Sequence, residues 1–194
     1  SALTSGVAAA ITASNSAINT AVGSALNTAI STYISSMIVA NPLSIPAGAN
    51  AGVSSLAAGN SSATIATDAV NAANAVDPSL IPQLMIGALT TIVNGVRSSA
   101  AGQTAIATSV GNFTDGALAG PNAKTAAQAA AAAALTSGSD MTTIIGNANT
   151  AAQGVVSAIS AAYVSGAAAL TLAIKSEVLF LNTAVSIKRF GSMA

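Results

Sequence analysis

The first 67 residues of this chain carry no charged side chain, and this feature constrains the fold more than any other. Apolar residues recur through the first half of this segment at helical spacing: Val7, Ile11, Ile18, Val22, Leu26, Ile30, Tyr33 and Met37. If Ser14 or Asn15 takes the one missing turn, the spacing averages about 3.75 residues per turn, slightly above the helical 3.6. Ser, Thr and Asn fill the opposite face. We therefore predict a long helix over residues 3–40 whose polar face is uncharged, an unusual choice for a face exposed to water.

The best packing partner for this helix is the most apolar stretch of the chain, residues 155–190. Its expected packing stripe, which would meet the N-terminal helix or a neighbouring copy, is Leu170, Ile174, Val178, Leu181 and Val185. Residues 155–174 are uncharged and long enough to span a bilayer. However, they are rich in Ala, Ser and Gly, and Lys175 and Glu177 follow at once. A buried bundle helix is therefore favoured over a membrane anchor, which is kept as the alternative.

Helix-breaking residues divide the chain between these two stretches. We expect breaks at Gly59-Asn60, Gly102 and Ser137-Gly138, with Pro46 holding residues 41–48 extended. The pair Asp77-Pro78 predicts an N-cap and a first helical residue, although Pro82 can delay that helix start. An Ala-rich helix is expected over residues 122–135, and Asp140 is expected to cap a last helix over residues 141–190. We found no strand alternation and no exact internal repeat.

These patterns together predict an all-α protein with a single domain, residues 1–194. The expected architecture is an elongated bundle of about five to seven helices, with long N-terminal and C-terminal helices. The hydrophobic fraction is 52% and the charged fraction 5%, against roughly 25% charge in ordinary soluble domains. This composition is the opposite of a disordered one.

The composition also excludes several classes of function. There is no Cys and no His, so the commonest nucleophile, general base and metal ligands are missing. Five basic residues, three of them crowded between Lys175 and Arg189, form no stripe that would follow phosphates. We therefore expect no enzyme activity, no cofactor, no metal site and no nucleic-acid partner.

The five carboxylates are interpreted as structural residues. Asp77 and Asp140 are expected to cap helices, Asp115 to lie in an Asp-Gly turn, and Asp68 to stand alone on a helix. Glu177 lies two residues from Lys175, a spacing at which helical side chains do not pair. Asn60 and Asn112 each match the N-glycosylation acceptor pattern, which an Asn-, Ser- and Thr-rich chain also produces by chance.

The low charge and the Ala- and Ser-rich helices resemble, in general texture, helical domains of silk proteins and other secreted assembly proteins. Residues 88–101 are the nearest local likeness, and no motif assigns the chain to a family. The function we expect is that of a structural, alanine-rich subunit that associates with copies of itself into an extracellular filament, coat or similar assembly. Its expected location is extracellular or on the surface of a cell or particle. The alternatives are a membrane-active or membrane-embedded protein and a module that binds ice or a hydrophobic solid.

Overall fold

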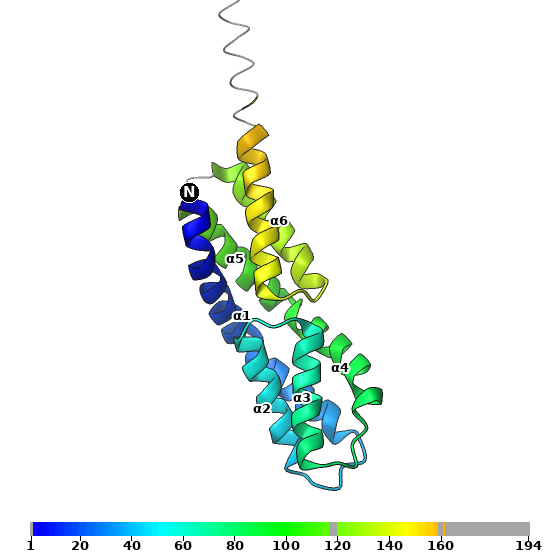
Figure 1. Ribbon diagram of the computed structural model, residues 1–194. Helices are drawn as coiled ribbons and strands as arrows, with labels where there is room; N and C mark the ends of the chain where they lie inside the picture. Colours follow the sequence, from blue (N-terminus) through cyan, green and yellow to red (C-terminus); the bar gives the residue numbers. More distant parts are fainter. Residues whose placement is uncertain (1, 117–119, 159–160, 162–194) are drawn as a thin grey trace, which may run out of the picture. The chain divides into compact units, whose positions relative to one another are not determined.

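A computed structural model of the chain describes residues 2–116, 120–158 and 161 (Figure 1). These residues form seven helices and no strand, which confirms the predicted all-α bundle. The helices are α1 (Ala2–Ser35), α2 (Ser44–Ala57), α3 (Ser62–Val76), α4 (Pro82–Arg97), α5 (Ala100–Gly116), α6 (Gly120–Thr136) and a last helix over residues 141–158.

The chain divides into two compact units, Ser1–Gly154 and Val155–Ala194. The first unit contains α1 to α6 and most of the last helix. Of the second unit, the structure describes residues 155–158 and 161. The predicted C-terminal helix is therefore described from residue 141 to residue 158, and its remainder lies outside the described residues. The single-domain prediction stays a prediction.

The long helix α1 has 34 residues, about 50 Å at 1.5 Å per residue. Its buried seam takes every fourth residue: Ala10, Ser14, Ile18, Val22, Leu26, Ile30 and Ile34. Four residues turn a helix by more than 360°, so such a seam drifts around the helix and needs successive partners. Ser14 meets α5 through a hydrogen bond to Ser109 (2.8 Å), whereas Ile34 packs over Gly48 of α2. The drift therefore lets one helix contact different neighbours along its length.

Small residues on the second helix let it approach α1 closely. A Cβ atom added at Gly48 or Gly52 would overlap the Cδ1 atoms of Ile34 and Ile30, respectively. The buried residues of α6 are likewise small, apart from one Leu: Ala123, Ala127, Ala131, Ala134 and Leu135. The Ala run of α6 is thus explained by close helix packing, in which side-chain volume would keep the backbones apart.

The chain contains an approximate duplication that its sequence does not show as an exact repeat. Five of the six buried positions of α2 (Ser44, Gly48, Gly52, Ser55 and Leu56) recur 79 residues later as the buried positions of α6. The buried positions of α1 from Ala10 to Ile34 recur, 79 or 80 residues later, as Leu89, Val93, Arg97, Gly102, Ile106, Val110 and Thr114. One three-helix repeat is therefore α1–α2–α3. The second has α4 and α5 together in place of α1, then α6 and the last helix.

The two loops that join the second and third helices of each repeat have matching geometry. Gly59 and Gly138 both adopt positive φ (82° and 78°), and the amide of each donates to the carbonyl of the Leu three residues before it. Glycine adopts this conformation without the strain that a side chain would cause. A hydroxyl or carboxylate then caps the following helix: Ser61 accepts from the Thr64 amide, and Asp140 from the Thr143 amide (2.7 Å). The expected breaks at both glycines and the Asp140 cap are confirmed.

The two repeats meet reciprocally, as the halves of a two-fold dimer do. The Ser62 amide donates to the Gly138 carbonyl (2.9 Å), and the equivalent Met141 amide donates to the equivalent Gly59 carbonyl (2.8 Å). α1 runs antiparallel to α4 and α5, which take its place in the second repeat. The start of α1 therefore lies beside the end of α5, and the end of α1 lies beside the start of α4. The Tyr33 hydroxyl reaches the Met85 carbonyl, and the Phe113 ring lies over Gly6. The described residues of the first unit thus form two similar repeats that meet like the subunits of a dimer.

Several predicted boundaries were wrong. α1 ends at Ser35, so Met37 lies beyond it. Pro46 does not keep its segment extended, because it lies in the first turn of α2, where its missing N–H leaves no hydrogen bond unmade. Gly102 does not end a helix, since α4 ends at Arg97 and Gly102 lies in the first turn of α5. Asp115 lies in the last turn of α5, not in a separate turn.

Candidate functional site

The residues expected to form packing or assembly contacts fall into three groups in the structure. Ile18, Val22, Leu26 and Ile30 are fully buried or nearly so. Val7, Ile11, Tyr33 and Met37 are half-buried. Leu170, Ile174, Val178, Leu181 and Val185 lie outside the described residues. Because α2, α4 and α5 already cover the seam of α1, copies of the chain would have to meet through other faces.

Arg97, which the sequence analysis did not single out, is the most unusual side chain of the first unit. It is only 1% exposed, at the end of α4 where the two repeats join. Its Nη1 donates to the Ser62 hydroxyl and its Nη2 to the Ser139 carbonyl, both at 2.8 Å. Its Nε has no hydrogen-bond partner. The guanidinium therefore ties α4 to the first residue of α3 in one repeat and to the loop before the last helix in the other.

The environment of Arg97 is costly for a cation. Burial lowers the pKa of Arg97 to about 10, and the charge of Asp140 opposes this effect. A pKa below the usual value means that the folded state disfavours the protonated form. Ser62, Asn94 and Thr136 form a polar cluster with Arg97. The Ser62 hydroxyl donates to Asn94 Oδ1, and Asn94 Nδ2 donates to the Thr136 carbonyl (2.8 Å). The cluster is hydrogen-bonded internally, and its arrangement supports a structural role.

A sequence signal for this buried Arg did exist. Met85, Leu89 and Val93 precede it at four-residue intervals, and all three are buried. Arg97 is the next position in that series, at which α1 carries Ile18 in the other repeat. Apolar residues at four-residue intervals that lead to Arg97 therefore indicated that Arg97 is buried. The general expectation that Arg lies at the surface outweighed this signal.

Asp77 is not the N-cap of α4, as predicted, but a clamp between two loops. Its Oδ2 accepts from the amides of Ala40 (2.6 Å) and Asn41 (2.9 Å). Its Oδ1 accepts from the amide and hydroxyl of Ser79. These bonds, led by that from the Ser79 hydroxyl and then that from the Asn41 amide, hold the pKa of Asp77 below its usual value. The helix it was expected to cap begins instead at Pro82.

The remaining described carboxylates show no catalytic pairing. Asp68 on α3 accepts a hydrogen bond from the Ser55 hydroxyl (2.6 Å), and Asp140 caps the last helix. Among the described residues, no group of three or more Asp or Glu side chains could hold a metal ion. No described helix is long and apolar enough to cross a membrane.

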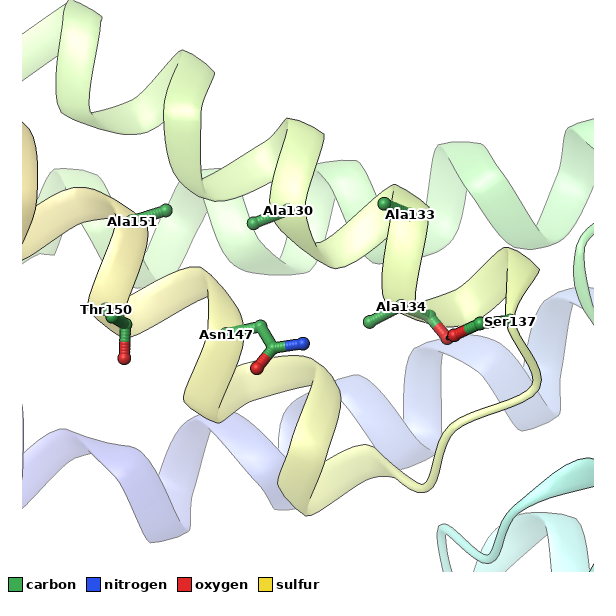
Figure 2. Close-up of a pocket in the computed structure, with 7 residues that line it drawn as sticks. All are labelled: Ala130, Ala133, Ala134, Ser137, Asn147, Thr150 and Ala151. Atoms are coloured by element: carbon green, nitrogen blue, oxygen red, sulfur yellow. Dashed lines mark hydrogen bonds between the residues drawn. The ribbon is translucent and has the colours of Figure 1, made fainter.

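A groove of about 520 Å³ lies between α6 and the last helix (Figure 2). Ala130, Ala133, Ala134 and Ala151 form most of its lining, and the Asn147 carboxamide extends toward Ala134. In the first repeat the equivalents of Ala134 and Asn147 are Ser55 and Asp68, which hydrogen-bond each other. The residues that line the groove are small and uncharged, with hydroxyl groups from Ser137 and Thr150 and no ionisable side chain among them.

The two glycosylation candidates have different surroundings. Asn60 is half-buried and its Nδ2 donates to the Ser55 hydroxyl (3.0 Å). Asn112 is exposed near the end of α5. Modification at either residue stays a prediction.

Comparison of the chain with protein-family models, with curated proteins and with solved structures found no match.

Proposed function

We propose that this protein is a non-enzymatic structural subunit that associates with copies of itself, in an extracellular filament, coat or similar assembly. The observation that carries this proposal is the scarcity of exposed charge on the described part of the first unit. Of the charged side chains whose exposure the structure describes, Asp77 and Arg97 are buried, and Asp68, Lys124 and Asp140 are half-buried. A surface with so little exposed charge does little to keep copies apart.

The exposed hydroxyl groups make this surface easier to bury. Six threonines at exposed sites donate their hydroxyl hydrogen to the carbonyl four residues earlier in their own helix: Thr12, Thr28, Thr67, Thr91, Thr125 and Thr136. Burying a polar group costs free energy mainly when its hydrogen bonds are left unmade. Because these donors are already used, contact between copies removes few hydrogen bonds to water.

Sedimentation velocity of the full chain over a wide concentration range tests the proposal. We expect particles that grow with concentration. Their size should change little between low and high salt, because salt screens contacts between exposed charges and this surface has few of them. Electron microscopy of the same samples should show regular assemblies. A monomer at all concentrations would refute the proposal.

A pair of variants sharpens this test on the exposed face of α1. Thr20→Lys with Thr28→Lys adds like charges to that face, and we expect it to weaken assembly. Thr20→Val with Thr28→Val keeps the shape and the neutrality of the face and serves as the control. If the lysine variant assembles as well as the control, this face does not contribute to contacts between copies.

A second candidate, binding of ice or a hydrophobic solid, is favoured by the same face of α1. Its exposed residues are hydroxyl-bearing and methyl-bearing, among them Thr12, Ala13, Thr20, Ala21 and Thr28. Measurement of thermal hysteresis and of adsorption to a hydrophobic surface tests it. The membrane alternative depends on residues 155–174, which are largely outside the described residues. Release of the protein into the soluble fraction by carbonate washing would exclude it.

A further inference from the structure

Four exposed aliphatic side chains gather at one end of the first unit, where the α1–α2 and α3–α4 loops lie side by side. They are Ile38 (94% exposed), Leu43 (68%), Ile81 (54%) and Leu84 (74%), and we call them the apolar tip. Three of them line a hollow of about 230 Å³ whose other walls include Met37 and Met85. Leu43 does not line it. The tip thus presents an exposed aliphatic side chain, Leu43, and an apolar hollow lined by the other three residues.

The two loops that carry the tip are fixed to each other. Asp77 accepts hydrogen bonds from Ala40 and Asn41 of the first loop and from Ser79 of the second. Asn74 also donates to the Leu80 carbonyl (2.8 Å) in the second loop. The exposed side chains are therefore displayed on a defined backbone and not on independent loops.

Three residues of the apolar tip have no aliphatic counterpart of similar size at the equivalent positions of the other repeat. The positions equivalent to Ile81 and Leu84 in the other repeat are Ala2 and Ser5, and the position equivalent to Leu43 is Asn122. Both repeats form the same three-helix arrangement, yet these large aliphatic residues occur in only one of them. Exposed aliphatic groups gathered around a hollow are typical of a binding surface.

We infer that the apolar tip is a contact surface between two copies of this chain, in which Leu43 of each copy enters the hollow of the other. Residues 36–43 and 78–85 contain no charged side chain, and the neighbouring Asp77 is only 2% exposed, so two tips approach with little repulsion. The same neutrality leaves no cation to attract anionic lipid and no charge to select a charged protein. The methionines at the hollow can adapt to an inserted side chain.

The size of the tip sets the strength of the contact. A stable pair of proteins usually buries about 20–30 residues on each side. The four aliphatic residues and their neighbours are fewer, so we expect a weak, concentration-dependent pair that is strengthened by further contacts in an assembly. This inference rests on the proposed self-association and assigns one of its contact surfaces.

Sedimentation velocity of the full chain tests the inference with a variant that the chain itself suggests. Ile81→Ala with Leu84→Ser installs the residues of the equivalent positions, and we expect it to raise the concentration needed for association at least tenfold. Val156→Ala, at an exposed aliphatic residue of the last helix (42% exposed), is the matched control and should leave association unchanged. Circular dichroism should show the same helix content in all three proteins.

A cysteine cross-link reports the geometry, because the natural chain has no Cys. Leu43→Cys should form disulfide-linked dimers under mild oxidation, and the Ile81→Ala/Leu84→Ser changes should suppress them. Thr20→Cys, on the exposed face of α1, should form fewer. These yields distinguish a tip contact from random collision.

The outcomes separate the tip from the proposed function. If the tip variant assembles like the natural chain, the tip contact is refuted and self-association stands. If the natural chain is monomeric at all concentrations, self-association itself fails, and the tip contact fails with it. If a monomeric natural chain binds zwitterionic lipid vesicles and the tip variant does not, the tip is a lipid-binding surface and the second copy is refuted.

Discussion

The junction between α4 and α5 offers a sharp test of the packing, through the substitution Gly102→Ala. A Cβ atom at Gly102 would overlap the carbonyl oxygen of Arg97, which belongs to the backbone and cannot rotate away. The methyl group would therefore push the start of α5 from the end of α4, where the Arg97 guanidinium makes its two hydrogen bonds. At Gly95 of α4, by contrast, nothing lies within 4 Å of an added Cβ.

The two glycines should therefore respond in opposite directions. In a helix, Ala is favoured over Gly by about 0.5–1 kcal/mol, which is the full expected effect of Gly95→Ala. At Gly102 the cost of overpacking, about 1–3 kcal/mol, outweighs this gain. We expect this cost to lie at the upper end of that range, because backbone atoms must move to make room for the methyl group. We expect Gly102→Ala to lower the free energy of unfolding by about 2 kcal/mol, so that the two variants differ by about 3 kcal/mol.

Thermal unfolding followed by circular dichroism measures this difference. A protein of this size shifts in Tm by about 2–4 °C per kcal/mol, so the two variants should unfold about 6–12 °C apart. Urea unfolding gives the same comparison at constant temperature. Equal Tm values for Gly102→Ala and Gly95→Ala would refute the close contact between α4 and α5.

Three further predictions follow from the polar residues of the first unit. Since the pKa of Asp77 is lowered in the folded state, its carboxylate stabilises the protein above its unfolded pKa of about 3.9, and this stabilisation is lost as the pH falls through the folded pKa. Asp77→Asn should therefore be less stable than the natural chain at pH 7, and urea unfolding should show the gap narrowing as the pH falls below about 3.9. At Arg97, Lys keeps the buried charge but cannot make both hydrogen bonds, so Arg97→Lys should lower the free energy of unfolding by about 2–4 kcal/mol. Arg97→Met also removes the cost of burying a charge, so its loss of stability should be smaller. An equal loss of stability in the two variants would contradict this account. Removal of the N-cap by Ser61→Ala should cost about 1 kcal/mol in the same assay, with the exposed Ser16→Ala as a control that changes little. Asp140→Ala should cost more, because it also removes the charge that favours protonated Arg97.

The sequence predicted the helices well because local signals set them. Helical spacing of apolar residues and the Gly59 and Gly138 breaks act within a few residues, so they can be read without knowledge of the fold. The exact seam of α1 could not be predicted in this way. Its four-residue stride depends on α1 contacting α5 at one end and α2 at the other, which is a property of the whole bundle.

The duplication and the role of Asp77 were missed for a different reason. The two repeats agree in where side chains are buried, not in which residues are used: Gly48 corresponds to Ala127, and Ile18 to Arg97. Small residues of several kinds satisfy the same close contact, so residue identity is lost while the packing pattern is kept. Asp77 was assigned by its neighbour Pro78, but its carboxylate serves a loop 36 or 37 residues away in the chain.

The duplication separates what the fold requires from what this chain uses in addition. Leu56 and Leu135, like Gly59 and Gly138, occupy equivalent positions and make equivalent hydrogen bonds or core contacts, so these residues are explained by folding alone. Differences between the repeats cannot be explained in that way. The Ser55–Asp68 hydrogen bond in one repeat gives way to a groove in the other, and the Ile81 and Leu84 pair replaces two small residues. Each repeat therefore serves as a control for the other, and the surfaces at which they differ are where contacts with another molecule should be sought first.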